Sequence, residues 1–139
     1  MSRRTITIAA ALSVLALGSQ LITGCSNSAG DIHFRSADEK YKRGNYQGAI
    51  DDLTKAIEID PIASAYYNRG VAKDYLEDYQ GAIADYTKAI EIDPDDASAY
   101  TNRGISRVLV NDRKGACDDW RKSENLGGIS AILLVETKC

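Results

Sequence analysis

A nearly verbatim internal repeat constrains the fold of this chain more than any other feature of its sequence. Residues 79–94 read YQGAIADYTKAIEIDP and residues 46–61 read YQGAIDDLTKAIEIDP, so fourteen of the sixteen positions are identical. A weaker third copy, RKGACDDWRKSENLGG, occupies residues 113–128. A period of thirty-three or thirty-four residues indicates a solenoid, in which each repeat is stabilised by packing on its neighbours.

Each repeat contains two segments with the apolar period of a helix. In the middle repeat, five apolar residues of the second segment form one helical stripe; these are Ala82, Ile83, Tyr86, Ala89 and Ile90. Proline removes a backbone donor and clashes with the preceding turn, so Pro94 predicts the end of this helix, and Pro61 predicts the end of its counterpart in the first repeat. The first segment of the middle repeat predicts another helix over residues 65–76.

Glycine recurs inside the first helix of two repeats. Gly70 and Gly104 are thirty-four residues apart, and each costs about 1 kcal/mol relative to alanine in a helix interior. This cost predicts that two helix backbones cross closely at the glycine. The small residues Ala82 and Ala116, at the start of the partner helix, are consistent with such a crossing.

The repeat resembles the tetratricopeptide repeat, a helix-turn-helix unit of thirty-four residues. The middle copy carries the resemblance through Tyr66, Gly70, Tyr79, Ala82, Tyr86, Ala89 and Pro94. The resemblance implies an all-α solenoid of three helix-turn-helix repeats over residues 31–128, with boundaries at about 31–62, 63–96 and 97–128. The terminal repeats are expected to be atypical because each has one face without a neighbouring repeat. Apolar residues in the segment 129–139 predict a seventh helix that caps the third repeat.

The first twenty-four residues have the pattern of a secretion signal. Arg3 and Arg4 precede an uncharged run over residues 5–24, which polar residues interrupt, so a permanent membrane-spanning helix is the less favoured interpretation. The sequence LITGC at residues 21–25 resembles the bacterial lipobox. The resemblance implies a signal peptide over residues 1–24, a diacylglycerol thioether on Cys25 and an acyl chain such as palmitate on its new amine. Two such chains anchor a protein stably in a bilayer.

The predicted anchor implies a location in the bacterial cell envelope. Residues 25–30 would be the lipidated cysteine and a short linker, which would keep the repeats close to the membrane on its periplasmic or external side. Ser26 follows the cysteine, and the outer membrane is favoured because aspartate at this place is the inner-membrane retention signal in enteric bacteria.

Charge and motif content exclude several classes of function. Removal of Arg3 and Arg4 would leave fifteen basic and twenty acidic residues, a formal charge of −5, which argues against nucleic acid as the main partner. No nucleophile–base pair, phosphate loop or cofactor motif is present, and the single His33 is insufficient for a metal site. Neither an enzyme nor a cofactor is therefore expected. Aspartates that recur with the repeat are interpreted as a solvated helix face; these are Asp51, Asp52, Asp85, Asp118 and Asp119.

Cys117 and Cys139 remain once Cys25 carries lipid. One interpretation is a disulfide that staples the predicted C-terminal helix to the third repeat, which would add about 3 kcal/mol of stability. The other is two separate thiols, with Cys117 buried as a small apolar residue and Cys139 free at a frayed end.

The resemblance implies a groove, lined by the first helices of successive repeats, that takes an extended or helical peptide. Eight residues are the expected lining: Tyr67, Asn68, Val71, Tyr75, Thr101, Asn102, Ile105 and Leu109. The two asparagine amides offer a donor and an acceptor to a peptide main chain, or alternatively bond locally between neighbouring helices. Arg69 and Arg103 are expected to pair with aspartates of the second helix of their own repeats while their stems pack.

One function found in the family is not supported by this sequence. The carboxylate clamp that recognises acidic C-terminal tails needs Lys and Arg on the groove helices, whereas the matching places here hold Phe34, Asp38, Asn68, Ser98 and Asn102. The predicted function is a membrane-anchored adaptor that binds a protein or peptide segment. The alternative is a pilotin-like structural assembly factor that binds through the repeat ends or the convex face. A third interpretation, a partner of a peptidoglycan enzyme, differs from the first only in the partner.

Overall fold

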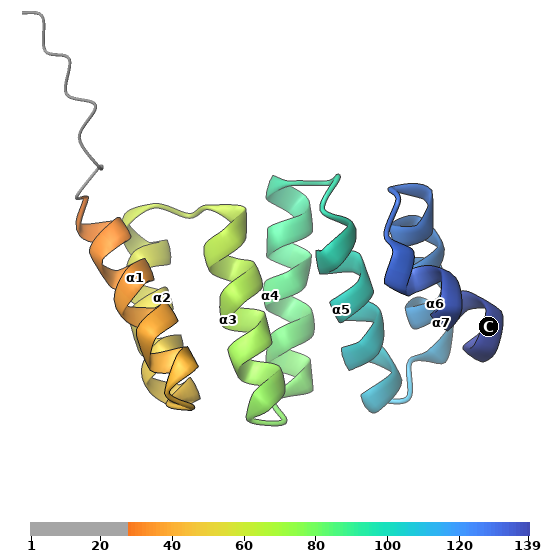
Figure 1. Ribbon diagram of the computed structural model, residues 1–139, viewed down its shortest axis with the longest axis horizontal. Helices are drawn as coiled ribbons and strands as arrows, with labels where there is room; N and C mark the ends of the chain where they lie inside the picture. The colour runs from red at the N-terminus through yellow and green to blue at the C-terminus, as the bar shows by residue number, and fades with distance from the viewer. Residues whose placement is uncertain (1–27) are drawn as a thin grey trace, which may run out of the picture.

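The computed structural model describes residues 28–139, which form seven α-helices that lie side by side along one axis (Figure 1). They are α1 (Ala29–Lys42), α2 (Tyr46–Ile59), α3 (Ala63–Tyr75), α4 (Tyr79–Ile92), α5 (Ala97–Leu109), α6 (Arg113–Asn125) and α7 (Ile129–Lys138). The helices pack in the pairs α1–α2, α3–α4 and α5–α6, and α7 packs on α6. The predicted all-α array of three repeats and a capping helix is confirmed.

The helices α1, α3, α5 and α7 begin at residues 29, 63, 97 and 129. The helix expected over residues 65–76 is α3, which begins two residues earlier and ends one residue earlier. The predicted signal peptide and Cys25 lie outside the described residues. Within residues 28–139, no helix is both long enough and apolar enough to cross a bilayer.

Side-chain caps and prolines set the ends of the helices. Ser28 and Asp31 form a capping box at the start of α1. The helices α2, α4 and α6 begin with one shared device: the side chain of Asn45, Asp78 or Asp112 accepts a hydrogen bond from a glycine amide three residues later, at 2.9–3.0 Å. The predicted stops are confirmed, because α2 and α4 each end two residues before a proline.

The recurring glycines make room for aromatic rings. A Cβ atom on Gly70 would lie 2.9 Å from the ring of Tyr86, and one on Gly104 would lie 2.4 Å from Nε1 of Trp120. The sequence predicted a close backbone crossing against Ala82 and Ala116, whereas the atoms nearest to the glycines belong to large side chains one turn further along the partner helix. The first repeat has the complementary exchange, with Ala37 packed in one cluster with the smaller Leu53.

Two arginines form a buried ion pair within their own repeat and a hydrogen bond to the repeat before it. Arg69 donates to both carboxylate oxygens of Asp85, at 2.9 and 2.7 Å, and to the hydroxyl of Thr54 in the preceding repeat, at 3.1 Å. Arg103 repeats this arrangement with Asp119, at 2.9 and 2.6 Å, and with Thr87, at 3.0 Å. The predicted pairing of both arginines with aspartates of the second helices is confirmed.

The prediction of a solvated aspartate face was wrong for three of the five aspartates. Asp52, Asp85 and Asp119 are only 5%, 3% and 3% exposed, because cations of the adjacent helix neutralise them. Lys73 and Arg107 supply a second cation to Asp85 and Asp119, each at 2.8 Å. Asp51 and Asp118 are exposed, as predicted.

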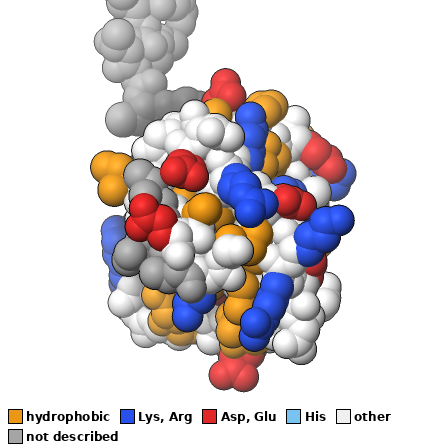
Figure 2. Space-filling model, turned by 90° about the vertical axis from the view of Figure 1, so that its right-hand side faces the viewer, with side chains coloured by type: hydrophobic (Ala, Val, Ile, Leu, Met, Phe, Trp, Pro, Cys, Tyr) orange, Lys and Arg blue, Asp and Glu red, His pale blue; other side chains and the backbone are white. Residues whose placement is uncertain are grey.

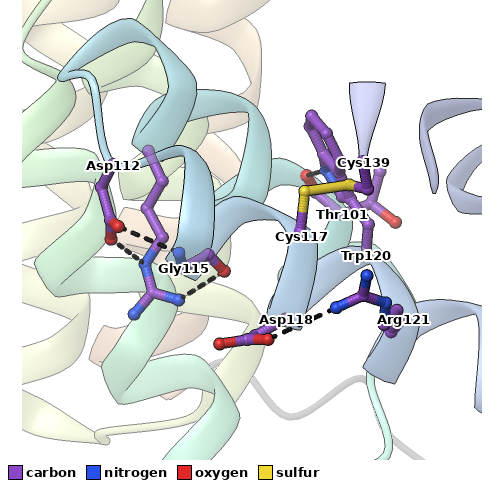
Figure 3. Close-up of a disulfide and its surroundings, with 9 residues drawn as sticks. Thr101, Asp112, Gly115, Cys117, Asp118, Trp120, Arg121 and Cys139 are labelled. Carbon is purple, nitrogen blue, oxygen red and sulfur yellow. Dashed lines mark hydrogen bonds and ion pairs between the residues drawn. A yellow bond between two sulfur atoms is a disulfide. The ribbon is translucent and has the colours of Figure 1, made fainter. Parts of the chain in front are cut away.

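A disulfide joins α6 to the residue that follows α7 (Figure 3). The Sγ atoms of Cys117 and Cys139 are 2.07 Å apart, and the Cα atoms are 5.7 Å apart. Beside it, Trp120 donates from Nε1 to the carbonyl oxygen of Thr101 at 3.2 Å, and Ala131 of α7 packs against Trp120. The C-terminal helix is thus held on the third repeat by a covalent bond as well as by packing.

Candidate functional site

A pocket lies among the first helices of the three repeats, where the sequence predicts a groove. It has a volume of about 260 Å³. We call it the α1–α3–α5 pocket. It is lined by Phe34, Ala37, Asp38, Tyr41, Leu53, Tyr67, Asn68, Val71 and Asn102. Four of these nine residues were among the eight predicted from the sequence, namely Tyr67, Asn68, Val71 and Asn102.

Five lining residues were not among the eight predicted groove residues: Phe34, Ala37, Asp38 and Tyr41 of α1, and Leu53 of α2. Phe34, Ala37, Asp38 and Tyr41 are spaced so that they share one face of α1, and all four line the pocket. Their segment departs from the sequence pattern that the first helices of the other two repeats share. The i, i+3, i+4, i+7 spacing was nevertheless visible in the sequence and is the signal by which these residues are found.

The two predicted asparagine amides have different surroundings. Asn102 donates from Nδ2 to the hydroxyl of Tyr67 at 2.9 Å, across the interface of α5 with α3. Within residues 28–139, the amide of Asn68 makes no side-chain hydrogen bond, although it lines the same pocket. The local role that the sequence left open therefore applies to Asn102, whereas Asn68 retains donors and an acceptor for a ligand.

A buried polar network lies behind the pocket and fixes the helices that form it. Tyr86 donates its hydroxyl hydrogen to Asp74 at 2.8 Å, and Ser106 donates to the same carboxylate at 2.8 Å. One side chain of α3 thereby connects α4 and α5. Burial raises the pKa of Asp74, although these two hydrogen bonds oppose the rise. Burial, followed by the hydrogen bond to Asp74, also raises the pKa of Tyr86, so its phenol stays protonated as a donor.

A second pocket of about 260 Å³ continues the same face toward α7. It is lined by Tyr67, Ala97, Ser98, Thr101, Asn102, Gly128, Ile129 and Ser130. Both pockets share Tyr67 and Asn102, so this hydrogen-bonded pair forms the divide between them. Thr101, which was predicted to line the groove, does line this part of it but is only 9% exposed, and its hydroxyl bonds to Ser123 at 2.7 Å.

Three predicted groove residues do not line either pocket. Tyr75 stacks on Tyr46 with ring centroids 4.6 Å apart and meets Tyr41 edge-on at 5.5 Å. Ile105 and Leu109 are 42% and 52% exposed on α5. These side chains form exposed apolar surface outside the pockets, and the spacing of the repeat alone did not distinguish the two situations.

The pockets carry almost no charge. Among the described residues that line them, Asp38 is the only ionisable group besides two tyrosines, and neither Lys nor Arg is present. Burial and then the nearby charge of Asp96 raise the pKa of Tyr67, which lies between the pockets. The site is therefore a polar, aromatic surface with a negative bias.

Comparison with known proteins identifies the repeat. The protein-family model described as "Tetratricopeptide repeat" matches residues 63–96, and a second family model, described as "TPR repeat", matches residues 37–73. A search of curated protein sequences gives no match. Tetratricopeptide-repeat domains are generally non-catalytic scaffolds, so the site is considered as a binding surface.

Solved structures of the same architecture include several peptide complexes. The TPR domain of Arabidopsis OM64 is 29% identical, with a TM-score of 0.74 over 78% of this chain and 92% of that one. The second TPR of Spaghetti (RPAP3) bound to the HSP90 peptide SRMEEVD is 26% identical, with a TM-score of 0.69 over 71% and 93% of the two chains. The second TPR domain of human RPAP3 in complex with the HSP70 peptide SGPTIEEVD is 25% identical, with a TM-score of 0.71 over 77% and 95%. The chain thus contains tetratricopeptide repeats within residues 37–96, as part of an all-helical array of six paired helices and a C-terminal helix.

Proposed function

We propose that this protein is a membrane-anchored adaptor of the bacterial cell envelope that binds a peptide segment of a partner protein along α1, α3 and α5. The observation that carries the proposal is the α1–α3–α5 pocket, which contains the amide of Asn68, a group that makes no hydrogen bond within residues 28–139. Solved relatives with 25–26% identity hold peptides in their TPR domains, which supports the same use here. Asn68 would hold the main chain of the ligand, and the aromatic rings would cover its side chains.

The anchoring part of the proposal rests on the lipobox resemblance of residues 21–25. Cys25 would carry the lipid, and only two residues lie between it and Ser28, where the structure begins. The groove would then lie close to the membrane surface. The outer membrane is the favoured location because Ser26, and not aspartate, follows Cys25. Substitution of Cys25 by serine is expected to abolish labelling by radioactive palmitate and to move the protein from the membrane to the soluble fraction. Unchanged labelling would refute the anchor without bearing on the groove.

The groove is tested by affinity capture from detergent-solubilised envelopes, with retained proteins identified by mass spectrometry. The Asn68→Ala variant is the sharpest probe, because this amide has no hydrogen bond to lose within the described fold. The matched control is Gln80→Ala, which removes an exposed amide from α4, outside both pockets. A partner retained by the wild type and by the control but at least tenfold depleted with Asn68→Ala is the expected result.

Equal retention by all three proteins would place the binding site elsewhere and favour the structural assembly factor. One such site would be the surface at the C-terminal end of the array (Figure 2). Apolar side chains on this end are divided by Lys and Arg and by Asp and Glu, so no single apolar patch dominates the view. The groove remains the better candidate because a pocket and an amide without a hydrogen bond to any described residue coincide there.

A further inference from the structure

We propose that the α1–α3–α5 pocket selects a basic side chain, Lys or Arg, of the bound peptide. This inference rests on the proposed peptide-binding function and specifies its ligand class. The pocket joins the rings of Phe34, Tyr41 and Tyr67 to one carboxylate, that of Asp38. A ring face attracts a cation through its quadrupole, and the carboxylate in the lining of the same cavity supplies the opposite charge.

The size and polarity of the pocket fit a long side chain. A volume of about 260 Å³ is slightly below the range of about 300–1,000 Å³ that drug-sized ligands occupy. The apolar wall of Leu53 and Val71 suits the methylene stem of Lys or Arg, while the charged end needs a polar partner. Asn68 remains available for the backbone of the same residue.

Asp38 is accessible to such a ligand. Its side chain is 53% exposed, and its partner is Lys42, one turn further along α1, which is 70% exposed. Exposed pairs at this spacing contribute little to stability, so a peptide cation can displace Lys42 at small cost. No other cation competes, because the described residues that line the pocket include neither Lys nor Arg.

The same arrangement disfavours acidic ligands. A carboxylate on the peptide would meet Asp38 and no compensating cation in the pocket. The relatives described above bind SRMEEVD and SGPTIEEVD, peptides with acidic ends. The α1–α3–α5 pocket of this chain would present the carboxylate of Asp38 to such a peptide.

The experiment is selection of a random twelve-residue peptide library displayed on phage against the full-length chain in detergent. Selected peptides are then synthesised with blocked ends, and their affinities are measured by fluorescence anisotropy. Peptides enriched in Lys or Arg at one position are expected. Replacement of that residue by glutamine should weaken binding about five- to tenfold, and Asp38→Asn should remove most of the difference between the two peptides.

Glu39→Gln is the matched control for Asp38→Asn. It removes the same charge from the same helix but lies outside the pocket, where Glu39 pairs with Arg43. Selected peptides without a basic position, or a basic preference that Asp38→Asn and Glu39→Gln alter equally, would overturn the inference while leaving peptide binding intact. Failure to select any peptide that Asn68→Ala weakens would overturn the proposed function itself.

Discussion

Substitution of Gly104 by alanine tests the packing logic of the array most directly. The new Cβ atom would lie 2.4 Å from Nε1 and 2.7 Å from Cδ1 of Trp120, well inside the ordinary contact range of 3.4–4 Å. The ring must move by about 1 Å, and its hydrogen bond to the carbonyl of Thr101 is then lost. Overpacking of this kind costs about 1–3 kcal/mol, and the rigid ring places Gly104→Ala at the upper end.

The helix itself offsets part of this cost. Alanine is favoured over glycine in a helix interior by about 1 kcal/mol, which leaves a net loss of about 2 kcal/mol in the free energy of unfolding. Urea unfolding followed by circular dichroism at 222 nm measures it. Gly70→Ala should cost less, because its nearest atom lies 2.9 Å away, and Gly30→Ala serves as the control, since its nearest atom lies at an ordinary 3.5 Å.

The first repeat suggests the rescue. There Ala37 packs in the same cluster as Leu53, so Gly104→Ala combined with Trp120→Leu should be less unstable than the sum of the two single variants. A Gly104→Ala variant as stable as the wild type, or a double variant with purely additive losses, would refute the pairing of glycine with the large ring.

Three other perturbations follow from the described contacts. Arg69→Ala leaves the buried carboxylate of Asp85 with Lys73 alone and should cost about 2–4 kcal/mol in urea unfolding, whereas a loss below about 0.5 kcal/mol would show that the pair is not buried in solution. Reduction of the Cys117–Cys139 disulfide should lower the free energy of unfolding by about 3 kcal/mol, and a variant with both cysteines replaced by serine should not respond to reductant. For Asp52, burial raises the pKa, but the hydrogen bonds of Lys40 and Ser36 and the charges of Lys40 and Lys55 outweigh it and leave the pKa lowered. Because the pKa of Asp52 is lower in the folded state, its ionised carboxylate stabilises the fold at pH values above its unfolded pKa of about 3.9, and this stabilisation is lost as the pH falls through the folded pKa. The loss of unfolding free energy caused by Asp52→Asn should therefore shrink between pH 7 and pH 3. A constant or growing difference would contradict this assignment.

Much of the fold could be predicted from the sequence because the same pattern occurs in three copies. The apolar stripe of the second helices, the prolines after them and the recurring glycines all point to one arrangement. The agreement covers the order and the pairing of the helices. It ends where a contact depends on which side chain occupies a space, as with Gly104 and Trp120, since periodicity places a residue on a face without naming its neighbour.

The site was only half predictable for related reasons. Asn68 and Asn102 occupy equivalent places, yet within residues 28–139 only Asn102 has a side-chain partner, because the first repeat has Phe34 where the middle repeat has the hydroxyl of Tyr67. The buried aspartates were misassigned because a charge that recurs with the repeat looks the same in sequence whether it meets water or a cation. The sequence predicted that Arg69 pairs with an aspartate of the second helix, but only the crossing of the two helices shows that the partner is Asp85, sixteen residues away.

The hydrogen bond from an arginine of one repeat to a threonine of the preceding repeat also gives the array a direction, because the two partners lie on opposite sides of a repeat. The middle repeat carries both halves of the link, Arg69 facing backward and Thr87 facing forward. The first repeat has Ser36 in place of the arginine, and the third has Arg121 in place of the threonine. The middle repeat is therefore the only unit compatible with a copy of itself, so a tandem duplication of residues 63–96 would lengthen the groove while keeping both terminal units in their places.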